Sequence, residues 1–98
     1  MLRTVKATDL NGNPKDTDSE NRIRTRKGYG VWVAKEGGFA STVESLKSLI
    51  GSRLYLIDTN DRYNDILSSK LTEVNEQDGL IQLVTENTIY FLERVSDQ

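Results

Sequence analysis

Apolar and polar positions alternate with a short period over much of the chain, and this pattern predicts a protein built mainly of β-strands. The strongest strand segments lie in the second half and are RLYLID (residues 53–58), DILSSKLTEV (65–74), GLIQLVT (79–85) and TIYFLERV (88–95). The segments between them contain the Asn, Asp or Gly residues that tight turns need. We therefore expect consecutive antiparallel strands from residue 52 onward.

Several of these strands are apolar on both faces. Leu54 and Leu56 alternate with Tyr55 and Ile57, and residues 88–95 show the same pattern. A half-exposed antiparallel sheet would alternate more cleanly between apolar and polar side chains. Either the sheet curls tightly enough to bury both faces, or a second subunit covers an edge, which favours a homo-oligomer formed by β-edge pairing.

A single short helix is predicted over residues 41–51. Ser41 and Glu44 have the spacing of a capping box, and Gly51 supplies a left-handed stop. The apolar positions predicted to share one helical face are Val43, Leu46, Leu49 and Ile50.

The first 40 residues have a different composition. Residues 10–21, LNGNPKDTDSEN, predict an exposed loop, and the segments on either side, TVKAT and IRTRKGYGVWVA, have strand character. We interpret them as an N-terminal β pair. The whole chain, residues 1–98, is then one domain with an N-terminal β extension (1–40), a helix (41–51) and a β-barrel (52–98).

Charge is distributed unevenly along the chain. The net charge is −2, but residues 1–35 hold eight Lys or Arg and four Asp or Glu, which gives +4 and leaves −6 for the remaining residues. An acidic chain is not a bulk polyanion binder, because phosphate affinity needs concentrated cations. A local basic face on an acidic body is compatible with this charge distribution.

The composition argues against an enzyme. The chain has no cysteine and no histidine, so it lacks a thiolate nucleophile and the commonest general base and metal ligand. The serines have neither a G-x-S-x-G elbow nor a base partner. We expect no catalytic residues and no cofactor. No long apolar run or signal-peptide pattern occurs, which predicts a cytoplasmic protein without membrane association.

The segment SLKSLIGSRLYLIDTNDRYNDILSSKLTEV resembles the helix and first two strands of the Sm/LSm and Hfq family, and TIYFLERV resembles its final strand. The resemblance extends to a phage-encoded, marine Sm-like subgroup, which implies the host cytoplasm as the location. It implies an Sm-like or SH3-like small barrel of about five strands that closes into an oligomeric ring and binds single-stranded RNA.

The sequence also departs from the family. Asp65 stands where the second strand usually has glycine, the Arg-Gly pair of the second Sm motif is absent between Gly79 and Val95, and the Tyr-Lys-His signature of Hfq is missing. Asn75 alone lies where a ring-lining asparagine is expected. One family strand has no counterpart unless residues 65–74, or the segment after Gly79, bend into two.

A second resemblance covers Lys27-Gly28-Tyr29-Gly30. These residues match the first four places of the RNP1 pattern, which is also the core of cold-shock domains, where aromatic residues on adjacent strands stack bases. The remaining places of the pattern do not match.

The same region contains the candidate binding residues. Alternation along a strand would place three arginines on one face, with a lysine extending the stripe and two aromatic rings nearby for base stacking. The predicted nucleic-acid-binding residues are Arg22, Arg24, Arg26, Lys27, Tyr29 and Trp32. The alternative is that the arginines form a solvated or inter-subunit salt-bridge face and that Trp32 belongs to the core.

Metal binding is not predicted. Asp9, Asn11, Asn13 and Glu20 have the spacing of an EF-hand loop, but Pro14 stands where that loop needs glycine. A plain hydrophilic loop is the better interpretation. The acidic residues between positions 58 and 65 are likewise explained by turn chemistry.

From the sequence we therefore expect a protein that binds single-stranded nucleic acid, RNA rather than DNA, as an Sm-like ring in RNA or DNA processing. The alternative is a structural or protein-interaction module, of phage origin, that binds no nucleic acid.

Overall fold

The structure is a computed structural model that describes residues 2–13, 29–58 and 66–94. Strands dominate it, as predicted, and the described part contains one short helix. The elements in chain order are β1 (Leu2–Thr8), β2 (Tyr29–Val33), β3 (Gly38–Phe39), α2 (Val43–Lys47), β4 (Arg53–Asp58), β5 (Ile66–Gln77), β6 (Leu80–Thr85) and β7 (Ile89–Arg94).

All strands belong to one antiparallel sheet with the order β1-β7-β6-β5-β4-β2-β3. The four strands after the helix form the expected meander of consecutive neighbours. The two-residue turn between β5 and β6 contains Asp78 and Gly79, whose φ angles are +54° and +79°. Positive φ at both positions is the requirement of a type I′ hairpin, which Asp-Gly meets.

In the described residues, β1 and β2 do not form the predicted N-terminal β pair. Strand β1 pairs with β7 and strand β2 pairs with β4, so the two N-terminal strands lie on opposite sides of the meander. They are members of the same seven-stranded sheet as the later strands, rather than an extension attached to a separate barrel of about five strands. The pairing partners of β1 and β2 are distant in sequence, which a local pattern cannot reveal.

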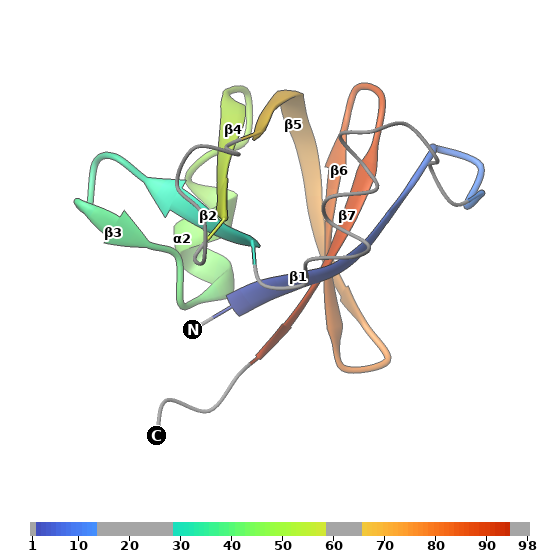
Figure 1. Cartoon of the computed structure of the whole chain (residues 1–98), viewed down its shortest axis with the longest axis horizontal. Coiled ribbons are helices and arrows are strands. Elements are labelled where there is room, and N and C mark those ends of the chain that lie inside the picture. The colour runs from blue at the N-terminus through green and yellow to red at the C-terminus, as the bar shows by residue number, and fades with distance from the viewer. Residues whose placement is uncertain (1, 14–28, 59–65, 95–98) are drawn as a thin grey trace.

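The sheet curls until its β1 and β2 ends approach each other (Figure 1). Strand β5 is central to the curl, because residues 66–70 pair with β4 whereas residues 71–77 pair with β6. The register shifts once in each of these two pairings, and bulges of this kind bend a strand and increase its twist. Strand β5 thus bends into two halves, one of the possibilities left open by the sequence.

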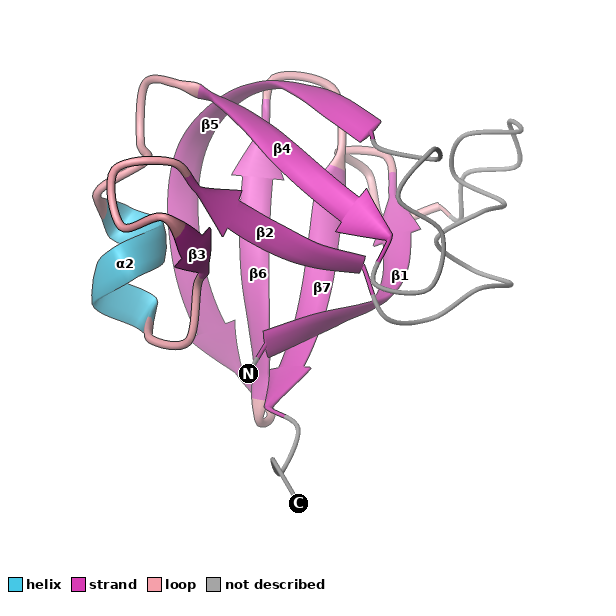
Figure 2. Cartoon of the chain, turned by 60° about the vertical axis from the view of Figure 1, so that its left-hand side comes forward, coloured by secondary structure: helices cyan, strands magenta, loops and turns pink. Residues whose placement is uncertain are grey.

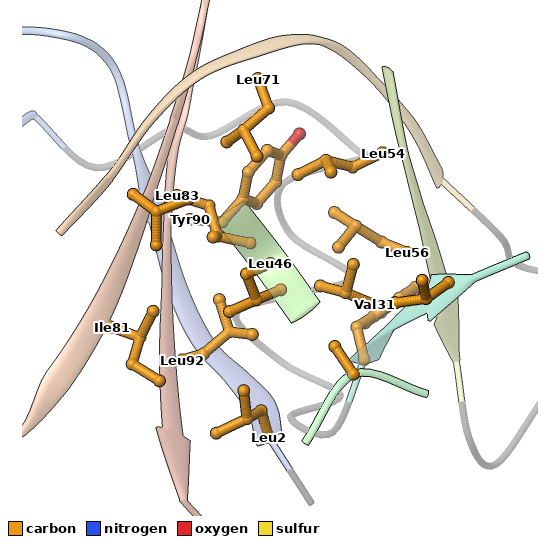
Figure 3. Close-up of a cluster of buried hydrophobic side chains, with 14 of the residues drawn as sticks. Leu2, Val31, Leu46, Leu54, Leu56, Leu71, Ile81, Leu83, Tyr90 and Leu92 are labelled. Atoms are coloured by element: carbon orange, nitrogen blue, oxygen red, sulfur yellow. The ribbon is translucent and has the colours of Figure 1, made fainter. Parts of the chain in front are cut away.

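The core fills the inside of the curl. In Figure 2, β2 and β4 lie in front of β6 and β7, and Figure 3 shows apolar side chains from these strands pointing toward one another. Leu46 of α2 lies among them and is fully buried, so the helix contributes directly to the core. Burial of a leucine side chain stabilises a fold by about 1.5–3 kcal/mol.

Helix α2 is shorter than predicted. Its N-cap is Thr42 rather than Ser41: Thr42 Oγ1 accepts a hydrogen bond from the Ser45 amide at 3.1 Å. The chain continues beyond Lys47 in tighter turns and reaches Gly51, whose φ of +95° is the predicted left-handed stop.

The tighter turns also change which apolar residues face the core. Val43 and Leu49 pack against the core cluster as predicted. Ile50 does not, since 49% of it is exposed. The α-helical spacing that would have brought Ile50 onto the same face ends before that residue.

Candidate nucleic-acid interface

The predicted basic stripe lies outside the described residues. Arg22, Arg24, Arg26 and Lys27 fall between residues 13 and 29, so the proposal that they contact phosphates stays a prediction. The two aromatic candidates, Tyr29 and Trp32, both lie in β2 and are described.

Tyr29 is part of the core. Its exposed fraction is 0%, and it belongs to the same buried cluster as Leu46 and Val31. A base cannot stack on a ring that solvent does not reach. The RNP1-like match requires an exposed ring at this position, so the resemblance does not extend to the placement of Tyr29.

Trp32 lies on the outer face of β2, where it alternates with the buried Val31 and Val33. It is half-buried, because Phe39 of β3 stands directly opposite and meets it edge to face, with ring centroids 5.4 Å apart and planes at 89°. This arrangement is a favoured geometry for two aromatic rings and fixes the orientation of the indole. Trp32 is thus neither a core residue nor a freely mobile surface ring.

The register of the sheet extends this pair into a continuous row across four strands. Trp32 is also paired with Tyr55 of β4, and Tyr55 is paired with Leu67 of β5. Tyr55 is 51% exposed and Leu67 is 46% exposed. We call Phe39, Trp32, Tyr55 and Leu67 the aromatic row.

A pair of cations lies beside the aromatic row. Arg53 of β4 and Lys70 of β5 are register partners, and both are exposed. Nε of Arg53 donates a hydrogen bond to the backbone oxygen of Ser68 at 2.8 Å. Neither cation forms an ion pair in the part of the chain that the structure describes.

The bulge that aligns these cations is built around Ser68. Its side chain is buried, and its Oγ accepts a hydrogen bond from the Leu54 amide at 2.9 Å while donating to the Ser69 oxygen at 2.6 Å. The hydroxyl thereby satisfies a buried backbone donor that the register shift leaves without a ladder partner. A serine predicted to have no catalytic partner thus has a structural role.

The turn between β6 and β7 forms hydrogen bonds with the same bulged segment of β5. The Glu86 amide donates to the Lys70 oxygen at 3.1 Å, and the Lys70 amide donates to the Glu86 carboxylate at 3.4 Å. The Asn87 amide donates to Ser69 Oγ at 3.2 Å. These bonds tie Ser69 and Lys70 to the β6–β7 turn and so support the part of β5 that carries the Lys70 side chain.

Tyr55, Leu67, Arg53 and Lys70 were not among the predicted site residues. The signal for Tyr55 was present, because β4 has an aromatic residue on the face opposite Leu54 and Leu56. We interpreted that pattern as a strand buried on both faces. The pairing of Arg53 with Lys70 had no sequence signal, since it depends on a bulge that shifts the register.

The loop with EF-hand spacing uses its first carboxylate for turn formation. Oδ1 of Asp9 accepts hydrogen bonds from the Asn11 and Asn13 amides at 2.8 and 2.9 Å, as in an Asx turn. Over residues 2–13, 29–58 and 66–94, no three His, Cys, Asp or Glu side chains come together as a metal site would require. Asn75, the expected ring-lining residue, is exposed on β5.

None of the helices in the described part of the chain has the length and apolar character needed to cross a membrane. Comparisons of the chain with protein-family models, with curated proteins and with solved structures find no match.

Proposed function

We propose that the chain binds single-stranded nucleic acid, RNA in preference to DNA, on the outer face of β2, β4 and β5. The observation that carries the proposal is the aromatic row, in which Trp32 and Tyr55 are direct neighbours on adjacent strands. Exposed rings on adjacent strands are the arrangement by which β-sheet proteins stack unpaired bases. The adjacent Arg53 and Lys70 supply positive charge for the phosphates.

Stacking also explains how an acidic chain could bind a polyanion. Each base stacked on an aromatic side chain contributes about 1–3 kcal/mol, and this contribution depends less on salt than phosphate contacts do. A chain with a pI near 5.1 therefore needs only a few well-placed cations beside the stacking surface. The faces of bases in a duplex are already stacked on each other, so the aromatic row favours single strands.

The proposal is tested by fluorescence anisotropy with labelled 12-nucleotide RNA, DNA and a duplex of the same sequence, each at two salt concentrations. We expect both single strands to bind more tightly than the duplex and more weakly at the higher salt concentration. Absence of binding to single strands at low salt, or equal binding of the duplex, would reject the proposed function.

The Sm-like ring is the assembly that we propose for this function, acting in RNA or DNA processing. The outer strands of the meander, β4 and β7, are already paired with β2 and β1 within the chain. A ring formed by edge pairing would therefore use the outermost strands, β1 and β3. A sedimentation mass equal to one chain would remove the ring from the proposal and leave the binding face intact.

The second candidate function is a protein-interaction module. It is favoured by Leu67, an exposed apolar side chain at the end of the aromatic row that offers no π face to a base. Retention of protein partners by the wild-type chain but not by a Leu67→Ser variant, with no binding of single strands, would support this function instead.

A further inference from the structure

The aromatic row and the cation pair are parallel. On β4, Arg53 precedes Tyr55 by two residues and therefore lies on the same face, about 6.5–7 Å away along the strand. Because of the bulge, the three steps along β5 from Leu67 to Lys70 span the same distance as the two steps along β4 from Tyr55 to Arg53. Without this extra residue Lys70 would not stand opposite Arg53.

From this alignment we infer that a nucleic-acid strand crosses β2, β4 and β5 at a steep angle to the β-strands, with bases on the aromatic row and phosphates on Arg53 and Lys70. The inference rests on the proposed function and deepens it, because it assigns the phosphate contacts and the path of the strand.

The covalent structure of a nucleic-acid single strand fits the parallel arrangement of the aromatic row and the cation pair. The sugar joins each base on one side to the phosphate backbone on the other, so an extended strand that lies flat presents one line of bases and one line of phosphates. Neighbouring β-strands are about 4.7–4.9 Å apart, which sets the step between Trp32 and Tyr55 along the row. A path along β4 instead would carry the bases from Tyr55 directly onto Arg53.

The two cations are available for this role. Arg53 is anchored through Nε to the Ser68 oxygen, and its terminal nitrogens make no other bond to the described residues. The anchor holds the guanidinium beside the row and reduces the side-chain entropy that is lost when a phosphate binds. The Lys70 ammonium also has no ion-pair partner in the described ranges, and the backbone beneath it is fixed by Glu86.

The inference is tested by the salt dependence of affinity for a labelled 12-nucleotide RNA. Each phosphate contact made to a single strand contributes about 0.7 to the slope of log affinity against log salt concentration. The variant carrying Arg53→Gln and Lys70→Gln should lower that slope by about 1.4, which is the loss of two such contacts. Lys6→Gln, a cation on β1, is the matched control and should leave the slope unchanged.

Two further variants distinguish the loss of a positive charge from damage to the fold. Lys70→Gln alone removes one cation without removing the bond to Ser68, and it should lower the slope by about 0.7. Arg53→Lys keeps the charge and should retain most of the slope. An unchanged slope in the Lys70→Gln variant, or an equal fall with Lys6→Gln, would overturn the inferred path while the proposed function stands. Failure of the wild-type chain to bind RNA at all would reject the proposed function itself.

Discussion

The two halves of the curled sheet share one core but present different outer faces. In the half formed by β3, β2, β4 and β5, the register aligns the aromatic row. In the half formed by β1, β7, β6 and β5, three of the four corresponding register partners are polar. The four partners are Lys6, Phe91, Gln82 and Asn75, which we call the polar row.

The aromatic rings in the two rows differ in whether another side chain covers them. The Lys6 ammonium lies over the Phe91 ring, 4.5 Å from its centroid, so a side chain of the same protein already occupies that aromatic face. Tyr55 is half exposed, and no ring or cation contact to it occurs in the described part of the chain. Among the described residues, the half-exposed ring without such a contact therefore lies in the half that holds the aromatic row, and exposed apolar surface marks interaction sites.

The cations differ in the same way. Arg94, at the end of β7, forms an ion pair with Glu76 of β5. The hydrogen bond that Arg94 donates to the Glu76 carboxylate, and then the charge of that carboxylate, raise the pKa of Arg94 above the ordinary value. Arg53 and Lys70 have no such partner among the described residues, and this leaves them free for phosphates.

The largest effect is expected from the middle of the aromatic row. Tyr55→Ala should weaken binding of single-stranded RNA by about 5- to 150-fold, which corresponds to the loss of one stacked base at about 1–3 kcal/mol. Gln82→Ala, at the equivalent place in the polar row, should leave the affinity unchanged. Titration of labelled RNA with both variants checks this difference, and equal losses would mean that the two outer faces are not functionally distinct.

The bulge that aligns the aromatic row with the cations is tested by Ser68→Ala. The Leu54 amide would then be buried without its hydrogen-bond acceptor, which should lower the free energy of unfolding by about 1–3 kcal/mol. Ser69→Ala is the matched control, since the Ser69 hydroxyl accepts from an exposed turn and its loss should cost less. Urea denaturation of the two variants measures both values, and a larger cost at Ser69 would contradict this account of the bulge.

A smaller effect is expected at the end of the aromatic row. Phe39→Leu removes the edge-to-face contact that orients Trp32, a contact with a free energy of about 0.5–1.5 kcal/mol, and should weaken RNA binding by about 2- to 12-fold. Phe39→Tyr retains the ring and should restore the affinity. If Phe39→Leu binds RNA as tightly as the wild-type chain, Phe39 does not position the indole for binding.

The smallest effect is expected in the polar row. Lys6→Gln removes the cation above Phe91 and should lower the free energy of unfolding by about 0.5–1 kcal/mol, the usual range for an exposed cation–π contact. RNA affinity should not change. Thermal denaturation together with the RNA titration measures both quantities, and a loss of affinity would show that the polar row also contacts RNA.

The sequence predicted the elements after residue 52 well, because their limits are set locally. Strand β4 has the predicted bounds, and the β5–β6 turn follows from Asp78 and Gly79, two residue types suited to positive φ. The positions of β1 and β2 in the sheet could not be predicted in this way. Each pairs with a strand more than twenty residues away in the sequence. Which strand becomes the partner is determined by tertiary packing and not by the local sequence pattern.

The candidate site was only partly predictable for the same reason. Trp32 was identified from its residue type, but a residue type alone could not show that Tyr29 points into the core while Tyr55 points outward. The alignment of Arg53 with Lys70 requires a register shift, and register shifts leave no mark in the composition of a strand.

The most direct test of the central claim uses Trp32, the single tryptophan of the chain, which lies in the aromatic row itself. Its fluorescence should be quenched as single-stranded RNA is added, should reach saturation, and should recover when salt releases the RNA. Saturating binding that leaves the Trp32 fluorescence unchanged, with binding followed independently by a label on the RNA, would contradict the claim that bases stack on the aromatic row.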